Sequence, residues 1–329
     1  MMKDLDIQRL ENLKIVFMGT PEFAVTILDT LVKNDCNIVG VITAPDKPAG
    51  RGQKLAQSDV KKYADEHSLH TLQPTNLKDE AFIAELQALN ADLFVVVAFR
   101  MLPEVVWAMP PKGTINLHAS ILPNYRGAAP INWAIINGET ETGVTTFFIE
   151  KEIDTGKIIE RNTLAIGENE TVGELHDRLM QLGASTTLST VNKIALGDVR
   201  GIPQIELTEG ELKNAPKIFK PTCEVDFSQP VQIVHNFIRG LSPYPAAWCS
   251  LKHKESGEVK TFKLFACSKT AEKVASTTEI KLSPEGLLFP CGDCYLLITE
   301  LQPEGKRRMD WKAFQAGNDI KDYELIIKS

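Results

Sequence analysis

The chain has 329 residues, and its 43% hydrophobic and 24% charged residues are the proportions of a globular protein, which excludes disordered and collagen-like chains. It has no uncharged apolar run near the roughly 18 residues of a membrane span, and its first ten residues lack the apolar core of a signal peptide. Its six cysteines are too few for a disulfide scaffold. We therefore expect a cytoplasmic protein. The net charge of −7 divides into −9 for residues 1–210 and +2 for residues 211–329, which argues against a general nucleic-acid binder and permits a local polyanion contact in the second half.

The first half of the chain alternates short apolar runs with amphipathic stretches. Residues 13–18 have the sequence LKIVFM, an almost continuous apolar run typical of a strand buried on both faces. Thr20, Pro21 and Glu22 suit the N-cap, the first position and the acidic first turn of a helix that we expect to end near Lys33. Repetition of the order strand, helix, strand predicts a Rossmann-like, mostly parallel sheet with helices on both faces. Further strands are predicted at residues 37–43, 92–98, 114–117 and 144–149.

The turn after the first strand tests for a nucleotide cofactor. A dinucleotide-binding turn needs Gly-x-Gly-x-x-Gly, whereas residues 19–24 are GTPEFA, with one glycine. The chain also lacks the Gly-x4-Gly-Lys-Ser/Thr pattern of a phosphate-binding loop. These two observations argue against an NAD or FAD enzyme and against a P-loop NTPase.

The second half of the chain differs from the first in composition and in apolar periodicity. A long helix is predicted over residues 171–196, where Thr171 and Glu174 have the spacing of a capping box. Residues 201–221 are rich in Gly, Pro, Lys and Glu, with weak periodicity. Short β-rich runs separated by Gly and Pro follow, which predicts a small β-barrel or sandwich. We therefore expect an α/β domain over residues 1–204, a linker over 205–221 and a β-barrel domain over 222–329.

The most informative stretch is residues 115–127, INLHASILPNYRG. Asn116 and His118 are two residues apart at the end of a predicted strand, so their side chains point to the same face, at the sheet edge where parallel sheets place functional groups. An amide can donate to a developing oxyanion, and an imidazole can take or give a proton near neutral pH. The plain alternative is a hydrogen-bonded pair that only closes the strand.

An acidic residue after the next β-rich run supports the catalytic alternative. Asp154 follows the predicted strand at 144–149, and a carboxylate there can orient an imidazole and stabilise its charged form. We find no serine or cysteine nucleophile beside a base in an obvious motif. The set of Asn, His and Asp therefore suits direct transfer through a tetrahedral intermediate better than a covalent enzyme intermediate.

Four segments together resemble the formyltransferases that use 10-formyltetrahydrofolate as co-substrate: NLHASILP at 116–123, RGAAP at 126–130, ETGVT at 141–145 and DTG at 154–156. The resemblance extends from about Lys14 to Leu325. It implies a Rossmann-like formyltransferase domain with a C-terminal barrel of the oligonucleotide-binding type, and no metal. It assigns catalysis to Asn116, His118 and Asp154. It assigns folate binding to Ser120, Ile121, Leu122 and Pro123.

Residues 43–55, TAPDKPAGRGQKL, bear on the formyl acceptor. They resemble the loop that the tRNA-directed branch of this family inserts after its second strand. The prolines and glycines predict a loop without regular structure, and Lys47, Arg51 and Lys54 supply charges suited to phosphates and base edges. The resemblance thus implies formyl transfer to the α-amine of methionyl initiator tRNA, for translation initiation, by a protein that we expect to be a monomer.

Two alternatives remain open at this point. One is a folate-dependent formyltransferase that acts on a nucleotide-sugar amine, and the other is a non-catalytic folate- or RNA-binding protein. The chain also departs from the family pattern Ala-Tyr-Gly after the strand at 92–98, because it has Ala98-Phe99-Arg100. Arg100 then either reaches the glutamate tail of folate or points to solvent.

Two motifs in the second half have simpler interpretations. Cys291-Gly292-Asp293-Cys294 has no second cysteine pair, so we interpret it as a hairpin turn and not as a zinc or redox site. Lys306-Arg307-Arg308 is the most basic cluster of the second half and is either a phosphate contact or a solvated turn.

Overall fold

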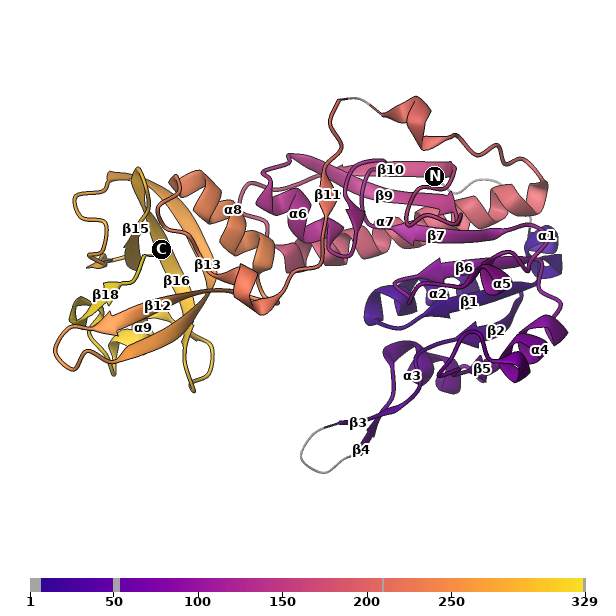
Figure 1. The fold of residues 1–329 in the computed structure, drawn as a ribbon, viewed down its shortest axis with the longest axis horizontal. Helices are drawn as coiled ribbons and strands as arrows, with labels where there is room; N and C mark the ends of the chain where they lie inside the picture. Colours follow the sequence, from indigo (N-terminus) through magenta and orange to yellow (C-terminus); the bar gives the residue numbers. More distant parts are fainter. Residues whose placement is uncertain (1–6, 50–53, 209, 328–329) are drawn as a thin grey trace. The chain divides into compact units, whose positions relative to one another are not determined.

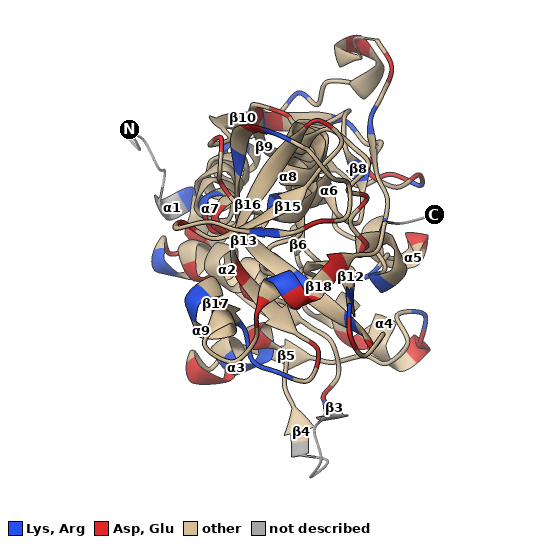
Figure 2. Ribbon diagram, turned by 90° about the vertical axis from the view of Figure 1, so that its left-hand side faces the viewer, with Lys and Arg blue, Asp and Glu red and all other residues tan. Residues whose placement is uncertain are grey.

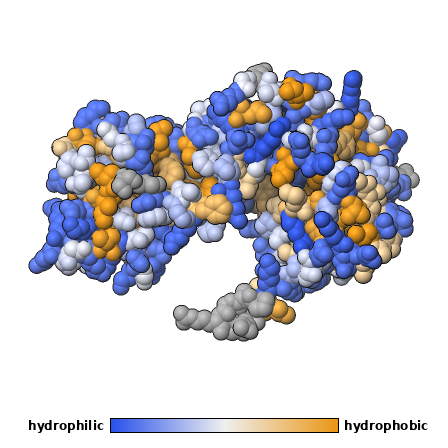
Figure 3. All heavy atoms as spheres, in the orientation of Figure 1, coloured by the Kyte–Doolittle hydropathy of each residue, from blue (hydrophilic) through white to orange (hydrophobic). Residues whose placement is uncertain are grey.

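The computed structural model describes residues 7–49, 54–208 and 210–327 (Figure 1). These residues divide into two compact units. The first takes its residues from 1–126, 143–164 and 177–214, and the second from 127–142, 165–176 and 215–329. Acidic and basic residues are interspersed along the ribbon (Figure 2), and hydrophilic residues cover much of the visible surface of both units (Figure 3).

A seven-stranded sheet forms the centre of the first unit. Its strands are β1 (Ile15–Gly19), β2 (Ile38–Ile42), β5 (Thr71–Leu72), β6 (Leu93–Val97), β7 (Thr114–His118), β9 (Glu141–Phe148) and β10 (Ile158–Ala165). Their order is β10-β9-β7-β6-β1-β2-β5. From β7 to β5 all neighbouring strands are parallel, whereas β9 runs antiparallel to β7. The predicted mostly parallel sheet is confirmed.

Helices cover both faces of this sheet, as predicted. On one face, Val96 of β6 packs with Phe82 and Val106, which belong to α4 (Glu80–Ala88) and α5 (Glu104–Trp107). On the other face, Leu117 contacts α7 (Val172–Leu196) at Gly183, where an added Cβ would lie 2.8 Å from the Leu117 side chain. Glycine at this position allows the long helix to approach β7 closely. The remaining helices of this unit are α1 (Ile7–Asn12), α2 (Glu22–Lys33) and α3 (Asp59–Glu66).

The two predicted helix starts have different outcomes. The capping box of α7 is confirmed, because the Thr171 amide donates to Glu174 at 2.8 Å and the Glu174 amide donates to the Thr171 hydroxyl at 3.3 Å. The N-cap of α2 is Pro21 and not Thr20, and no side chain caps that helix. The backbone of Thr20 takes part in a long-range contact, because its carbonyl accepts the Val60 amide at 3.4 Å.

The segment after β2 corrects a second expectation. Its prolines and glycines predicted a loop without regular structure, but β3 (Lys47–Ala49) and β4 (Lys54–Ala56) form an antiparallel ribbon that extends away from the rest of the first unit (Figure 1). Pro48 pairs with Leu55 in this ribbon. A proline is tolerated there because each strand of a two-stranded ribbon is an edge strand. The base of the ribbon is tied down by Gln73, whose amide donates to the Ala44 carbonyl at 2.9 Å and to Asp46 at 2.7 Å.

An antiparallel sheet forms the centre of the second unit. Its strands are β12 (Ala247–His253), β13 (Val259–Lys273), β14 (Lys281–Leu282), β15 (Leu287–Pro290), β16 (Cys294–Pro303), β17 (Met309–Asp310) and β18 (Tyr323–Leu325). Their order is β14-β15-β16-β13-β12-β18, and β17 pairs with β16. The two ends of the sheet meet, because Glu279 bridges Glu324 and the Leu325 amide donates to the Thr278 carbonyl at 2.9 Å. The predicted barrel is therefore confirmed.

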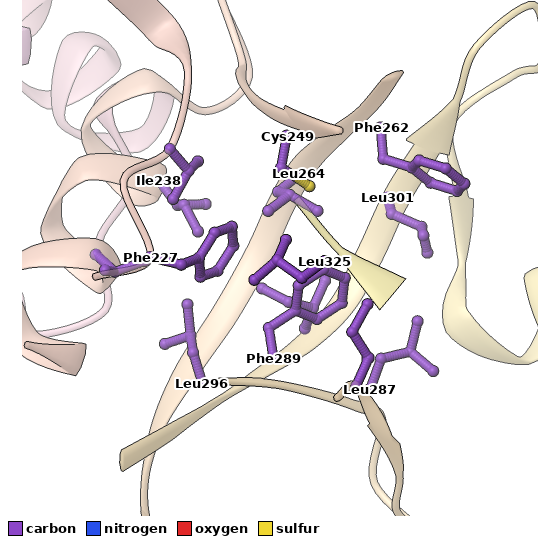
Figure 4. Close-up of a cluster of buried hydrophobic side chains, with 14 of the residues drawn as sticks. Phe227, Ile238, Cys249, Phe262, Leu264, Leu287, Phe289, Leu296, Leu301 and Leu325 are labelled. Carbon is purple, nitrogen blue, oxygen red and sulfur yellow. The ribbon is translucent and has the colours of Figure 1, made fainter. Parts of the chain in front are cut away.

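The barrel has an apolar centre that α8 (Val231–Leu241) completes from one side (Figure 4). Phe289 and Leu296 of the sheet and Ile238 of the helix are fully buried in one cluster. The α8 helix also packs on α6 (Pro130–Ile136), where Asn132 donates to the Gly240 carbonyl at 2.8 Å. The shorter elements of the chain are β8 (Arg126–Gly127), β11 (Asn214–Ala215), α9 (Trp311–Gln315), η1 (Gln204–Leu207), η2 (Lys220–Cys223) and η3 (Ile320–Asp322).

The Cys-x-x-Cys segment is a hairpin turn, as predicted. It connects β15 to β16, and the Cys291 amide donates to the Cys294 carbonyl at 3.1 Å. Both thiols are free and buried. Burial raises the pKa of Cys291 to about 12, so this thiol is protonated at neutral pH and is a weak nucleophile.

Candidate active site

Asn116 and His118 lie on the same face of β7, opposite Phe147 and Thr145 of β9. Asn116 is half-buried and His118 is buried. The strands from β7 to β5 are parallel, so both residues lie toward the carboxyl edge that β7, β6, β1 and β2 share. An amide donor and an imidazole are thus fixed to one strand at the edge where parallel sheets place their functional groups.

The imidazole of His118 is held by the backbone of the turn that follows β7. Its Nε2 lies 2.8 Å from the carbonyl oxygen of Tyr125. A carbonyl only accepts hydrogen bonds, so Nε2 carries the hydrogen. In the neutral ring the lone pair is then on Nδ1, and Nδ1 faces Oδ2 of Asp154 at 3.9 Å. Tyr125 has a left-handed backbone, with φ +61°, and its amide donates to the Lys213 carbonyl at 2.6 Å.

Asp154 lies in the turn between β9 and β10 and has a left-handed backbone, with φ +56°. The 3.9 Å between its carboxylate and Nδ1 of His118 is longer than a direct hydrogen bond. Both side chains are shielded from solvent, so the carboxylate faces the imidazole in a largely buried site. The structure thus brings together His118 and Asp154, two of the three residues expected to carry catalysis.

The turn of residues 120–123 is held by several hydrogen bonds. The Ser120 hydroxyl is buried and donates to the Asn124 carbonyl at 2.7 Å. The Thr145 hydroxyl donates to the Ser120 carbonyl at 2.6 Å and accepts the Leu122 amide at 3.1 Å. The Leu122–Pro123 peptide is cis. Leu122 is fully buried among core residues, whereas the side chain of Ile121 is only half-buried.

Arg100 is exposed and its guanidinium is bound to nearby backbone carbonyls. The choice between the folate tail and solvent stays a prediction. The Arg100 guanidinium donates to the Thr75 carbonyl at 2.9 Å and to the Pro74 carbonyl, and it lies 5.5 Å from the centre of the Phe99 ring. Partial burial lowers its pKa. The loop after β6 and the loop after β5 are thereby joined. Together they line an open groove with Lys78, Met101, Glu104 and Val105.

Two of the three residues expected to contact tRNA lie on the ribbon after β2. Lys47 is exposed at the start of β3, Lys54 begins β4, and Arg51 lies outside the described residues. The ribbon leaves the carboxyl end of β2, so it begins at the same sheet edge as His118. In the second unit, Arg308 donates to Glu300 at 2.7 and 2.6 Å and lies over the Phe265 ring.

Sequence reasoning missed two groups that hold this site. The Tyr125 carbonyl was missed because its role depends on a backbone angle. Gln204 was missed because it lies in a stretch of weak periodicity, yet its amide donates to the carbonyl of Asp154 at 2.8 Å and it is 3% exposed. No local pattern distinguishes such a buried glutamine from a surface one.

Two other classes of site are absent from the described parts of the chain. No cluster of three or more His, Cys, Asp or Glu side chains there is arranged to hold a metal ion. In the same residues, every helix is too short or too polar to cross a membrane.

Comparison with protein families gives a match to each half of the chain. The family described as "Formyl transferase" matches residues 13–191, and "Formyl transferase, C-terminal domain" matches residues 217–319. The chain therefore belongs to the formyl transferase family.

Relatives with curated names show which kind of formyl transferase the chain is similar to. The chain is 54% identical over 302 residues to a protein of Flavobacterium johnsoniae, a match that covers 91% of this chain and 94% of the relative. It is 53% identical over 303 residues to a protein of Bacteroides fragilis, covering 91% and 93% of the two chains. Both relatives are named methionyl-tRNA formyltransferase.

Solved structures support the fold at lower identity. The N-formyltransferase of Helicobacter canadensis, in complex with folinic acid and dTDP-3-aminofucose, has a TM-score of 0.64 and 19% identity, and the match covers 90% of this chain and 100% of that one. HypX of Aquifex aeolicus, in complex with tetrahydrofolic acid, has a TM-score of 0.62 and 18% identity over 92% of this chain and 46% of that one.

Proposed function

We propose that this formyltransferase moves the formyl group of 10-formyltetrahydrofolate to the α-amine of methionyl initiator tRNA, for translation initiation in the cytoplasm. The similarity to methionyl-tRNA formyltransferases over more than 90% of the chain supports the acceptor. The observation that carries the chemistry is the pairing of His118 with Asp154 beside Asn116 at one sheet edge.

We propose that Asn116, His118 and Asp154 have separate roles. The methionyl amine attacks the formyl carbon, and the bond from that carbon to N10 of the folate breaks. Asn116 donates to the formyl oxygen as negative charge develops there. His118 accepts the proton of the amine at Nδ1, since Nε2 already donates to Tyr125, and returns a proton to the departing nitrogen. Asp154 stabilises the charged ring between these two steps.

We propose that residues 120–123 bind the folate from one side. Their turn is fixed by buried hydrogen bonds, and it follows His118 directly, so a pterin against Ile121 lies next to the reacting groups. The proposed transfer needs no metal. The amide of Asn116 serves the developing negative charge, and the imidazole of His118 serves the proton transfers.

We propose that the ribbon of β3 and β4, with Lys47, Arg51 and Lys54, contacts the tRNA, and that the barrel domain over 222–329 adds further contacts. Arg308 is engaged with Glu300, which leaves Lys306 and Arg307 as the cations of that cluster for phosphate. The protein is proposed to act as a monomer, since one chain holds every group used here.

The acceptor is tested by offering labelled 10-formyltetrahydrofolate with either methionyl initiator tRNA or a dTDP-linked amino sugar. We expect rapid label transfer to the tRNA and none to the sugar. Transfer to the sugar alone would contradict the proposal and favour the sugar-amine alternative.

A further inference from the structure

The turn that presents Asp154 is tight. Asp154 itself has a left-handed backbone, which is unusual for a residue with a side chain. Two residues later, Gly156 lies so close to β9 that an added Cβ would overlap the Phe148 carbonyl oxygen, at 1.7 Å. A turn under these constraints needs contacts that keep it in place.

Gln204 supplies those contacts. Its Nε2 donates one hydrogen to the Asp154 carbonyl at 2.8 Å and the other to the Gly156 carbonyl at 2.9 Å. Both amide hydrogens thus bind the same turn, on either side of Thr155. The side chain is 3% exposed, so water does not compete for these bonds.

Arg126 fixes Gln204 from the opposite end. Its Nε and one terminal nitrogen donate to Oε1 of Gln204 at 3.0 and 2.5 Å. Oε1 is thereby identified as the acceptor end of the amide, and Nε2 must face the turn. The preceding residue, Tyr125, is the one whose carbonyl holds His118. Adjacent residues of one segment therefore act on both partners. Tyr125 binds the imidazole of His118. Arg126 orients Gln204, which binds the backbone of the turn that carries Asp154.

We infer that Gln204, oriented by Arg126, is a positioning residue that holds Asp154 at its working distance from His118. This inference rests on the proposed function, since it assigns Gln204 a role in the same reaction. A glutamine that only pinned the segment 203–208 to the domain would affect stability and leave the chemical step unchanged.

The test uses the full chain with Gln204→Met, which keeps the length of the side chain and removes its polar atoms, and with Gln204→Glu. The glutamate keeps the acceptor for Arg126 but presents oxygens, in place of donors, to the two carbonyls of the turn. Thr208→Val is the matched control, because its hydroxyl donates to the Gln204 carbonyl at 3.0 Å and does not touch the turn.

We expect both Gln204 variants to lower kcat by about 10- to 100-fold, as small displacements of a catalytic group do, with the KM for folate and for tRNA within about twofold of wild type. Thr208→Val should keep its kcat. In an Asp154→Asn background, Gln204→Glu should lower kcat by less than threefold, because the carboxylate that Gln204 positions is already lost. Folding of each variant is checked by its circular dichroism spectrum and Tm.

A Gln204→Glu variant that folds and keeps full kcat would overturn the inference. An equal loss of kcat with and without Asp154 would also overturn it, since the effect would then not pass through Asp154. Failure of the proposed function is a separate result, because the wild-type protein itself would then transfer no formyl group to methionyl-tRNA.

Discussion

At the scale of single residues, the two nitrogens of His118 have different surroundings. The Tyr125 carbonyl engages Nε2 and leaves Nδ1 toward Asp154. The sequence predicted the shared face of Asn116 and His118, since period two follows from the strand alone. It could not predict Tyr125 or Gln204 as partners, because those contacts depend on backbone angles and on a segment 50 residues from Asp154.

Replacement of Asp154 by Asn tests the charge at this site. Asparagine has the same shape and no charge, so we expect kcat to fall on the order of 100-fold while KM for both substrates changes little. Steady-state kinetics with each substrate varied in turn measures this split. A variant with the wild-type kcat would remove Asp154 from the mechanism.

A second residue-scale prediction concerns His235, which is fully buried on α8 in the second unit. Burial, with Arg239 and Lys269 nearby and only partly offset by Glu168, lowers its pKa to about 4. The unfolded chain takes up a proton near pH 6.5, and the folded chain does so only near pH 4. Stability should therefore fall as pH drops from 6.5 to 4, by up to about 3 kcal/mol.

Chemical denaturation of wild type and His235→Leu at several pH values measures this loss. The leucine variant should lack the part of the pH dependence that His235 contributes. Identical pH dependence in the two proteins would show that His235 does not cause the acid sensitivity.

At the scale of elements, the strands with apolar runs and the capped long helix were predicted, and the ribbon of β3 and β4 was not. β1, β2, β6, β7 and α7 follow from continuous apolar runs or a capping box. The ribbon of β3 and β4 was missed because proline and glycine argue against strands in general, whereas an isolated ribbon tolerates proline at its edges. The N-cap of α2 was misplaced by one residue, since the helix begins after Pro21 and no side chain caps it.

Removal of the ribbon tests its proposed contact with tRNA. Replacing residues 47–56 by a short Gly-Ser linker removes it while Gln73 still holds Ala44 and Asp46 at its base. We expect the KM for methionyl-tRNA to rise at least tenfold and the affinity for folate to stay unchanged, as measured by steady-state kinetics and by fluorescence titration. Lys33→Ala, on α2 and paired with Asp29, is the control for loss of a surface charge. Unchanged tRNA kinetics in the shortened protein would exclude the ribbon as a contact.

At the scale of the whole molecule, two compact units divide the chain in a way that one cut cannot reproduce, because residues 127–142 and 165–176 group with 215–329. The domain boundaries expected at residues 204 and 222 stay a prediction. The α/β fold and the barrel were predictable from the change in apolar periodicity. Closure of the barrel was not, since it depends on the bridge between Glu279 and Glu324, far apart in the sequence.

The measurement that tests the central claim most directly is single-turnover formylation of methionyl initiator tRNA by wild type and Asn116→Ala, with tRNA binding measured in parallel. We predict rapid transfer by wild type, a rate about 100- to 1,000-fold lower for the variant, and equal tRNA affinity. A variant as fast as wild type, or a wild type that binds folate and tRNA without transferring the formyl group, would contradict catalysis at the carboxyl edge of β7.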